Sequence, residues 1–369
     1  MIIYYVLLVL LCVFGLFIFL SKNPRKGRYE NILFVVSGVL LIALAALRGN
    51  GVDRDYNAYV VWIESVQPVT YYFSHPAELF QKDPAFVAIA SLVNTFFKGG
   101  TILVFAIMAA LGVSLKLAAV KRISPYILIC VIAYYSNYYL VQEMTQIRAG
   151  VASGFILMSI SEIYRRNPVM YSVYMLCAAA FHYSALVFVP LYFINPHTLN
   201  VKLYGIIIII SFLICAFKID IIPVFNIFGD NPLTERFIYY KSIFQNGFAT
   251  RFKPLNMFLM ARLGFCAFLL SKWQHLKTMD RYSALIIKIY LISIVVYLIF
   301  PTQPVFAVRF RDLIGVVEIF ILTYVMYLIN EKYALTGIAV VSFFMLSVLL
   351  FRHHLINPYF SSLSSVLPI

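Results

Sequence analysis

A succession of long apolar runs limits what this chain can fold into. A helix needs about 20 predominantly apolar residues to cross the hydrocarbon core of a bilayer. Only 12% of the residues are charged, whereas soluble domains are about 25% charged. The sequence therefore predicts an all-α polytopic membrane protein, with spans expected at 2–20, 31–47, 101–120, 124–141, 147–163, 203–217, 255–271, 282–300, 313–329 and 334–351.

Two further apolar segments do not fit a simple span. Residues 169–194 are too long for one helix and carry Phe181-His182-Tyr183-Ser184 in their middle, so we expect two short helices with a turn near His182. Broken helices at membrane depth must line protein or a cavity, because lipid cannot satisfy free backbone groups. Residues 84–98 are too short to span and suit an interfacial helix on the outer surface. The expected total is about twelve transmembrane helices, some short or broken.

The basic residues predict the orientation. Cytoplasmic loops are enriched in Lys and Arg, which explains the net charge of +14 without nucleic acid, and no nucleic-acid-binding pattern is present. We expect a single transmembrane domain over 1–369, an outer amino terminus, and outer loops at 48–100 and 218–253. The short inner loops then carry Lys22, Arg25, Lys26, Arg28, Lys116, Lys121, Arg122, Arg165, Arg166, Lys202, Lys272, Lys277, Arg281 and Lys332.

Arg148 lies in a stretch that otherwise reads as membrane. An ionisable residue at that depth costs roughly 2.5 to 3.5 kcal/mol on insertion scales and usually marks a functional site. The alternative to a functional role is a structural ion pair with Glu143. Arg309 and Arg311 repeat the pattern; their i, i+2 spacing after Pro301 and Pro304 predicts an extended or broken segment. These two could instead snorkel to lipid headgroups.

Converging arginines suit an anionic ligand such as a diphosphate. Asp53 and Asp55 follow Arg48 in the first outer loop, and either a local ion pair with Arg54 or a catalytic role fits them. His182 either caps its turn or binds a ligand. The tyrosines at 134–139 are more typical of an interfacial aromatic belt than of a sugar-stacking surface.

Other classes of activity have no support in the sequence. The motifs of serine hydrolases, zinc proteases and nucleotide-binding enzymes are missing. The five cysteines all lie in apolar runs without a C-x-x-C pair, so neither a metal site nor a disulfide framework is expected. No cofactor is expected either. A site on the outer face has no ATP or nucleotide sugar available. Its substrate must already be activated, and a lipid-linked diphosphate fits the arginines.

Six segments together resemble the EpsG-type, Wzy-like polysaccharide polymerases. Ala149 stands where that family commonly has Gln. In order, the segments are Arg48–Tyr59, Asp83-Pro84-Ala85-Phe86, Gln146-Ile147-Arg148-Ala149-Gly150, Phe181-His182-Tyr183-Ser184-Ala185-Leu186, Arg309-Phe310-Arg311 and Asn357-Pro358-Tyr359.

The resemblance implies a fold similar to multi-span GT-C-like glycosyltransferases and a metal-independent transfer on the outer face of the bacterial plasma membrane. Donor and acceptor would be undecaprenyl-diphosphate-linked glycans within the membrane lipid, and the product a longer O-antigen, capsule or exopolysaccharide chain. A chain-length regulator protein is an implied partner. The alternatives are a transporter or flippase of the lipid-linked repeat unit, and an O-antigen ligase.

The residue chemistry assigns roles within such a reaction. The acceptor hydroxyl needs a base, with Asp55 the first candidate, Asp53 the second and Glu143 the third. The departing diphosphate needs cations and hydrogen-bond donors. We expect these from Arg148, Arg309, Arg311 and His182. The glycan would contact Arg48, Tyr56, Tyr59, Tyr138 and Gln146.

Overall fold

The structure is a computed structural model that describes residues 1–362 except 22, 82, 98, 221–253 and 353–354. The regular secondary structure of the described residues is helical, and isolated backbone bridges join two of their loops. They form two compact units, which are described separately: unit 1 comprises Met1–Phe193 with Glu318–Ile369, and unit 2 comprises Ile194–Val317. The outer loop predicted at 218–253 lies almost entirely outside the described residues, and the expectation of a single domain stays a prediction.

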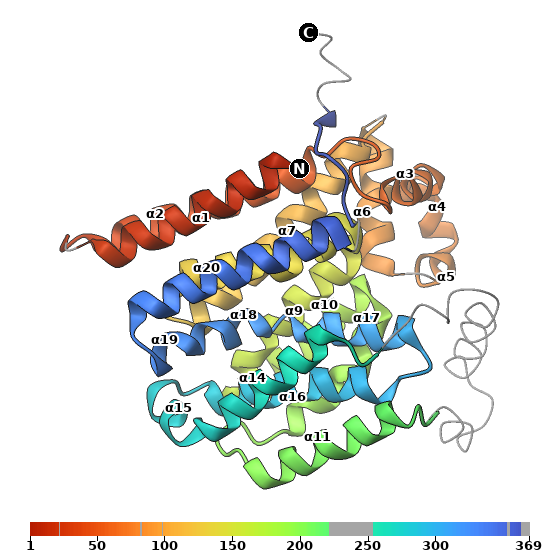
Figure 1. Cartoon of the computed structure of the whole chain (residues 1–369). Helices are drawn as coiled ribbons and strands as arrows, with labels where there is room; N and C mark the ends of the chain where they lie inside the picture. The colour runs from red at the N-terminus through yellow and green to blue at the C-terminus, as the bar shows by residue number, and fades with distance from the viewer. Residues whose placement is uncertain (22, 82, 98, 221–253, 353–354, 363–369) are drawn as a thin grey trace. The chain divides into compact units, whose positions relative to one another are not determined.

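Unit 1 contains most of the long helices (Figure 1). Its first part runs α1 (Ile2–Leu20), α2 (Lys26–Ala46), α3 (Tyr56–Ser65), α4 (Val69–Ser74), α5 (Pro76–Leu79), α6 (Pro84–Phe96), α7 (Thr101–Ile123) and α8 (Ile127–Tyr134). The π-helix η1 (Tyr135–Thr145), α9 (Ile147–Arg165), α10 (Pro168–Phe181) and the 3₁₀ helix η2 (Tyr183–Phe193) follow. Its last part is α18 (Glu318–Ile321), η6 (Leu322–Tyr324), α19 (Val325–Leu328), α20 (Glu331–Ser347) and η7 (Val348–Arg352).

Unit 2 is the smaller of the two. Its described helices are α11 (Val201–Ala216), α14 (Met257–Ser271), α15 (Trp273–Met279), α16 (Ser283–Ile299) and α17 (Pro304–Gly315). Within it, α16 is almost wholly buried.

The helices are those of a multi-pass membrane protein. Among the described residues, five helices are long and apolar enough to cross a membrane: Ile2–Leu20, Lys26–Ala46, Thr101–Ile123, Ile147–Arg165 and Glu331–Arg352. Seven shorter apolar helices accompany them. The predicted all-α membrane class is confirmed in this coarser form, and the figure of about twelve spans stays a prediction.

Several expected boundaries were wrong. The span predicted at 124–141 is α8 followed by a π-helix that continues to Thr145. The span predicted at 313–329 is divided, since its first residues belong to α17 and the rest is α18, a 3₁₀ turn and α19. The break predicted near His182 is confirmed, because α10 ends at Phe181 and η2 begins at Tyr183.

Small residues let the central helices of unit 1 approach closely. A Cβ atom added to Gly154 on α9 would lie only 2.8 Å from the Cβ of Leu115 on α7. Glycine at such positions allows close backbone contact between membrane helices. This close packing is consistent with the burial of α9, which is the most buried of the five long helices.

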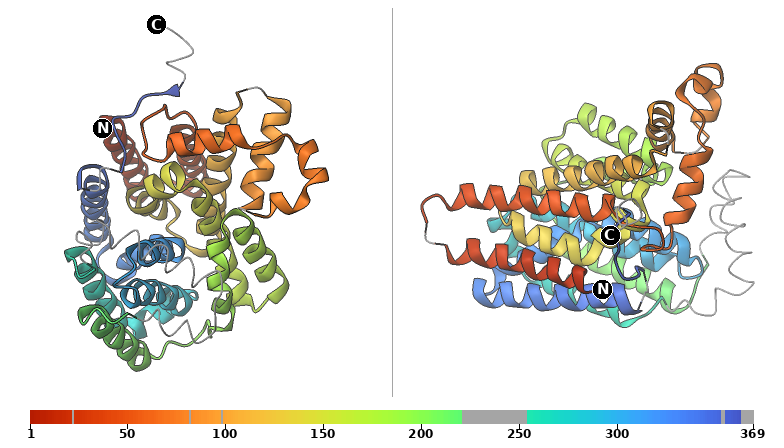
Figure 2. Two further views of the ribbon diagram at one scale, coloured as in Figure 1. Left: turned by 90° about the vertical axis from the view of Figure 1, so that its right-hand side faces the viewer. Right: turned by 90° about the horizontal axis from the view of Figure 1, so that it is seen from above.

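One end of unit 1 collects the polar segments. At this end α2 finishes, α7 and α9 begin and α20 finishes, and the short helices α3 to α5 project beyond it (Figures 1 and 2). The other end carries the basic residues Arg25, Lys26, Lys121, Arg122, Arg165, Arg166 and Lys332 at the opposite helix termini.

Candidate functional site

Three residues that are far apart in the sequence meet at the polar end of unit 1. Arg148 forms an ion pair with Asp83 through Nη1 and Oδ2. The other carboxylate oxygen, Oδ1, accepts a hydrogen bond from the backbone N–H of Tyr183 at 3.3 Å. His182 Nδ1 lies 3.9 Å from Asp83 Oδ2. The carboxylate of Asp83 therefore joins the start of α9 to the turn between α10 and η2.

Each of these residues lies in or directly beside an interruption of helical structure. Asp83 has a φ of 38° directly before Pro84, which is the first residue of α6. This left-handed conformation is uncommon for a residue other than glycine. Gln146 has a non-helical backbone conformation between η1 and α9. His182 has an extended conformation between α10 and η2. Such breaks place side chains and backbone groups in the protein interior rather than against lipid.

Aromatic rings pack around Arg148. Its guanidinium carbon is 4.5 Å from the centroid of the Trp62 ring and 5.9 Å from that of Tyr59. Trp62 in turn packs on Phe86, with ring centroids 4.6 Å apart. The rings orient the guanidinium through cation–π contact. The side chain stays 27% exposed, so part of the guanidinium remains accessible to an added anion.

Asp55 is the more accessible of the two loop aspartates. It precedes α3 and is half-buried, with its backbone N–H donating to Asp53 Oδ1 at 3.0 Å. Residues four apart on a helix lie on one face, so Asp55 stands one turn before Tyr59, the ring that contacts Arg148. Tyr56 and Tyr59 are themselves buried.

Asp53 is held in a buried ion pair. Arg48 Nε donates to Asp53 Oδ2 at 2.6 Å, and Arg48 Nη1 donates to the carbonyl of Ala45 at 2.5 Å. The Arg48 guanidinium carbon lies 4.3 Å from the centroid of the Phe105 ring. Both side chains are fully buried. The pair therefore stabilises the loop that follows α2.

The carboxy-terminal segment Leu355–Ser362 covers the same loop. The backbone N–H of Asn357 donates to the carbonyl of Val52 at 2.7 Å, and that of Gly49 donates to the carbonyl of Phe360 at 2.8 Å. Two sequence segments that resembled family motifs, the first and the last, are therefore one structural assembly.

Glu143 does not pair with Arg148. It accepts a hydrogen bond from Lys116 Nζ at 2.5 Å and another from the Tyr134 hydroxyl at 2.8 Å. Lys116 also donates to the carbonyl of Gly150 at 2.6 Å. The alternative of a structural Glu143–Arg148 bridge was wrong, and Lys116 is buried inside α7 rather than in an inner loop.

The remaining predicted glycan contacts differ in exposure. The Tyr138 hydroxyl donates to Glu318 Oε2 at 2.7 Å from a buried position, whereas Gln146 is half-buried at the break before α9. The other tyrosines of 134–139, Tyr134, Tyr135 and Tyr139, are also buried. Lys116 and Glu318 were not predicted as partners of these residues, and the only sequence signal for them is their placement inside apolar runs.

Arg309 and Arg311 belong to unit 2. They lie on the regular helix α17, with Pro304 at its first position, so the prediction of an extended or broken segment was wrong. Proline is tolerated there because the first helical N–H groups have no partner within the helix. Arg311 pairs with Asp312 and lies 5.4 Å from the Tyr297 ring centroid, whereas Arg309 is exposed.

Comparisons with known proteins agree with the observed motifs. A family model described as the EpsG family matches residues 31–365. The amylovoran biosynthesis protein AmsC of Erwinia amylovora is 23% identical over 190 residues, which is 50% of this chain and 50% of that protein. This chain thus matches only half the length of that relative. No solved structure matches this chain.

Proposed function

This chain belongs to the EpsG family, and we propose that it is a polysaccharide polymerase that joins undecaprenyl-diphosphate-linked oligosaccharide repeat units. The observation that carries the proposal is the convergence of Asp83, Arg148 and His182 from three separate segments. The name of the relative, an amylovoran (exopolysaccharide) biosynthesis protein, supports the same substrate class.

The proposed reaction is a glycosyl transfer. An acceptor hydroxyl oxygen attacks the anomeric carbon of the donor glycan, and the bond from that carbon to the diphosphate oxygen breaks. The hydroxyl proton passes to a carboxylate, and the lipid diphosphate leaves with the bonding electron pair. The site must therefore supply a base on one side of the anomeric carbon and positive charge on the other.

Arg148 is suited to binding the diphosphate that leaves in this reaction. A guanidinium binds diphosphate oxygens through paired, charge-assisted hydrogen bonds. Its partner Asp83 and the neighbouring Trp62 hold the guanidinium in place before substrate arrives, and preorganised donors of this kind are worth roughly 2.7 to 4 kcal/mol in rate. His182 lies beside Asp83, close enough to bind the negatively charged diphosphate together with Arg148.

Asp55 is the carboxylate best suited to take the proton. A general base must reach the substrate, and Asp53 and Glu143 are both buried in ion pairs with Arg48 and Lys116. Asp55 is half-buried and one helical turn from Tyr59. We assign structural roles to Asp53 and Glu143, whose buried ion pairs stabilise the site.

The orientation follows from the charge distribution in unit 1. Basic residues collect at the end opposite to the candidate site, and such residues favour the cytoplasmic side. The site then faces the outside of the bacterial plasma membrane. Arg309 and Arg311 stay proposed diphosphate ligands, and a chain-length regulator stays a proposed partner.

The competing functions are transport of the lipid-linked repeat and ligation of finished polymer. A transporter needs polar groups along a path through the membrane. In unit 1 the accessible charged cluster lies at one end. Among the charged side chains deeper in its described helices, Lys116 and Glu143 neutralise each other, and Glu318 accepts a hydrogen bond from Tyr138. A polymerase fits this arrangement better.

The test uses a strain that lacks this gene, complemented with the wild type, with Arg148→Ala or with no copy. Surface polysaccharide is separated on a gel. We expect a ladder of long chains from the wild type, and single repeats from Arg148→Ala and from the uncomplemented strain. Absence of any surface repeat in the uncomplemented strain would instead favour the transporter or the ligase, and a normal ladder from Arg148→Ala would remove Arg148 from the site.

A further inference from the structure

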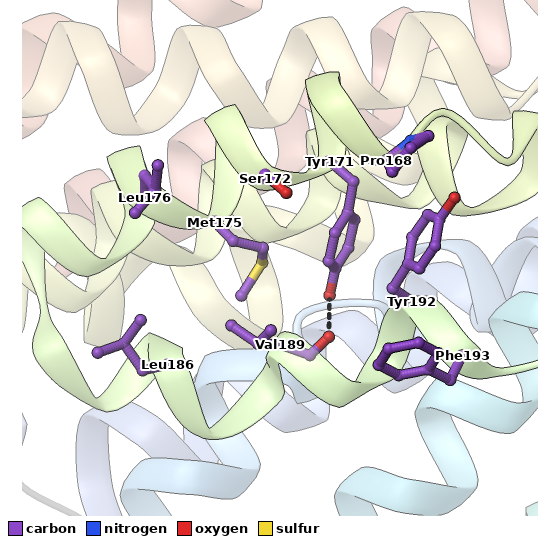
Figure 3. Close-up of a pocket in the computed structure, with 9 residues that line it drawn as sticks. All are labelled: Pro168, Tyr171, Ser172, Met175, Leu176, Leu186, Val189, Tyr192 and Phe193. Atoms are coloured by element: carbon purple, nitrogen blue, oxygen red, sulfur yellow. Dashed lines mark hydrogen bonds between the residues drawn. The ribbon is translucent and has the colours of Figure 1, made fainter.

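An apolar groove runs between α10 and η2 in unit 1 (Figure 3). Its volume is about 530 Å³, within the range typical of small-molecule sites. One wall comes from α10 through Tyr171, Met175 and Leu176, and the other from η2 through Leu186, Val189 and Phe193. Almost all of the lining is carbon, so the groove suits a hydrocarbon ligand.

Tyr171 holds the two walls at a fixed separation. Its hydroxyl donates to the carbonyls of Phe188 and Val189 at 3.1 Å and 3.0 Å. Pro190 lies inside the 3₁₀ helix, and a proline lacks the N–H that regular helical bonding needs. The hydrogen bonds of the Tyr171 hydroxyl join α10 to η2 beside the groove.

The rim of the groove carries exposed apolar side chains. Leu176 is 66% exposed and Phe193 is 81% exposed. Both side chains are apolar, and both belong to short apolar helices of a membrane protein. A chain that is already dissolved in the bilayer can thus enter the groove without crossing water.

The two ends of the groove differ in character. At one end Arg166 Nη1 donates to the carbonyl of Tyr192 at 2.7 Å and joins the end of α9 to the end of η2. At the other end, Leu176 and Leu186 stand on either side of the turn that contains His182. His182 is the residue that lies beside Asp83, the partner of Arg148. The apolar groove therefore ends beside the cluster of Asp83, Arg148 and His182.

We propose that this groove binds the polyprenyl chain of a lipid-linked diphosphate substrate, with the diphosphate at Arg148 and His182. The inference rests on the proposed function and adds the place of the hydrocarbon chain. The occupant has one chain and an anionic head, which matches a single groove with basic residues at its ends. Arg166 stands at one end and His182 with Arg148 at the other. We place the head at the second end because it belongs to the polar end of unit 1 and Arg148 is partly exposed there. A two-chain phospholipid would need a second groove beside it.

The matched variants are Ser172→Trp and Val173→Trp. Ser172 lines the groove, whereas its neighbour Val173 is exposed on α10 and is not among the lining residues. Both replacements put the same large side chain on an exposed position of one helix, so a difference between them reports on the groove rather than on folding.

Binding is measured on the full-length protein in lipid nanodiscs, with undecaprenyl diphosphate and with geranyl diphosphate, whose chain is much shorter. We expect the wild type to bind the long-chain probe at least tenfold more tightly. Ser172→Trp should lose that advantage and keep its affinity for geranyl diphosphate, while Val173→Trp should behave as the wild type does.

The opposite results separate the two proposals. If the wild type binds both probes equally, or if Ser172→Trp keeps full affinity for the long chain, the groove proposal is overturned and diphosphate binding stands. If the wild type binds neither probe, the proposed function fails together with the groove. A photoreactive undecaprenyl diphosphate should label 168–193, and loss of that label to added phosphatidylglycerol would show that ordinary lipid occupies the groove.

Discussion

Arg148 on α9 and Asp83 before α6 form an ion pair, although the sequence suggested Glu143 as the partner of Arg148. The pair joins α9, at the centre of unit 1, to the short helices α3 to α6 that follow α2. Because Asp83 is largely buried while Arg148 is 27% exposed, the carboxylate acts as a fixed support and the guanidinium retains access to a ligand.

The first prediction separates the structural and functional parts of this pair. Arg148→Ala leaves a buried carboxylate without its partner, which destabilises a protein strongly. We expect less protein in the membrane and no long chains. Asp83→Asn combined with Arg148→Ala removes both charges and should restore the amount of protein, measured by immunoblot of membranes, but not the long chains on a gel. Recovery of long chains in the double variant would show that Arg148 is only structural.

The second prediction concerns Lys116 and Glu143. Removing one partner of a buried ion pair costs about 3 to 5 kcal/mol, whereas replacing both can be nearly neutral. Lys116→Met and Glu143→Gln should each lower the melting temperature of the purified protein, and the double variant should recover most of it. Were Glu143→Gln to keep full thermal stability and yet abolish polymerisation, Glu143 and not Asp55 would be the base.

The third prediction tests Asp55 against Asp53. Loss of a general base lowers a rate by about 10² to 10⁴. Asp55→Asn should show such a loss with purified protein and lipid-linked repeats, at an unchanged melting temperature. Asp53→Asn should lower the melting temperature, since Arg48 loses its buried partner. Equal rates for Asp55→Asn and the wild type would exclude Asp55 as the base.

The fourth prediction concerns the glycines beside Glu143. A Cβ on Gly150 would collide with the carbonyl oxygen of Gln142, and one on Gly112 with Glu143 Oε2. Overpacking of this kind costs about 1 to 3 kcal/mol, so Gly150→Ala should lower the melting temperature. The control is Gly264→Ala on α14, where a Cβ meets nothing within 4 Å and alanine favours the helix by about 1 kcal/mol. An equal response of the two variants would contradict the packing described for α9.

The sequence alone determined the class of the protein and some of its breaks. Apolar length is a local property, and so the all-α membrane class and most helix positions could be predicted from the residues. The interruption at His182 was also local, because polar residues stand in the middle of an apolar stretch. The order of six short motifs indicated the family that the comparison then matched over residues 31–365.

Only the tertiary structure decided which charges pair. Glu143 and Arg148 are close in sequence, but Gln146 breaks the helix between them, so their side chains meet different neighbours. Lys116 looked like part of an inner loop, and helix packing placed it against Glu143. Asp83 was noted only as the acidic residue of a short motif and was assigned no role, yet it supports Arg148. An ion pair between distant segments depends on how helices pack, and no local pattern of residues contains that information.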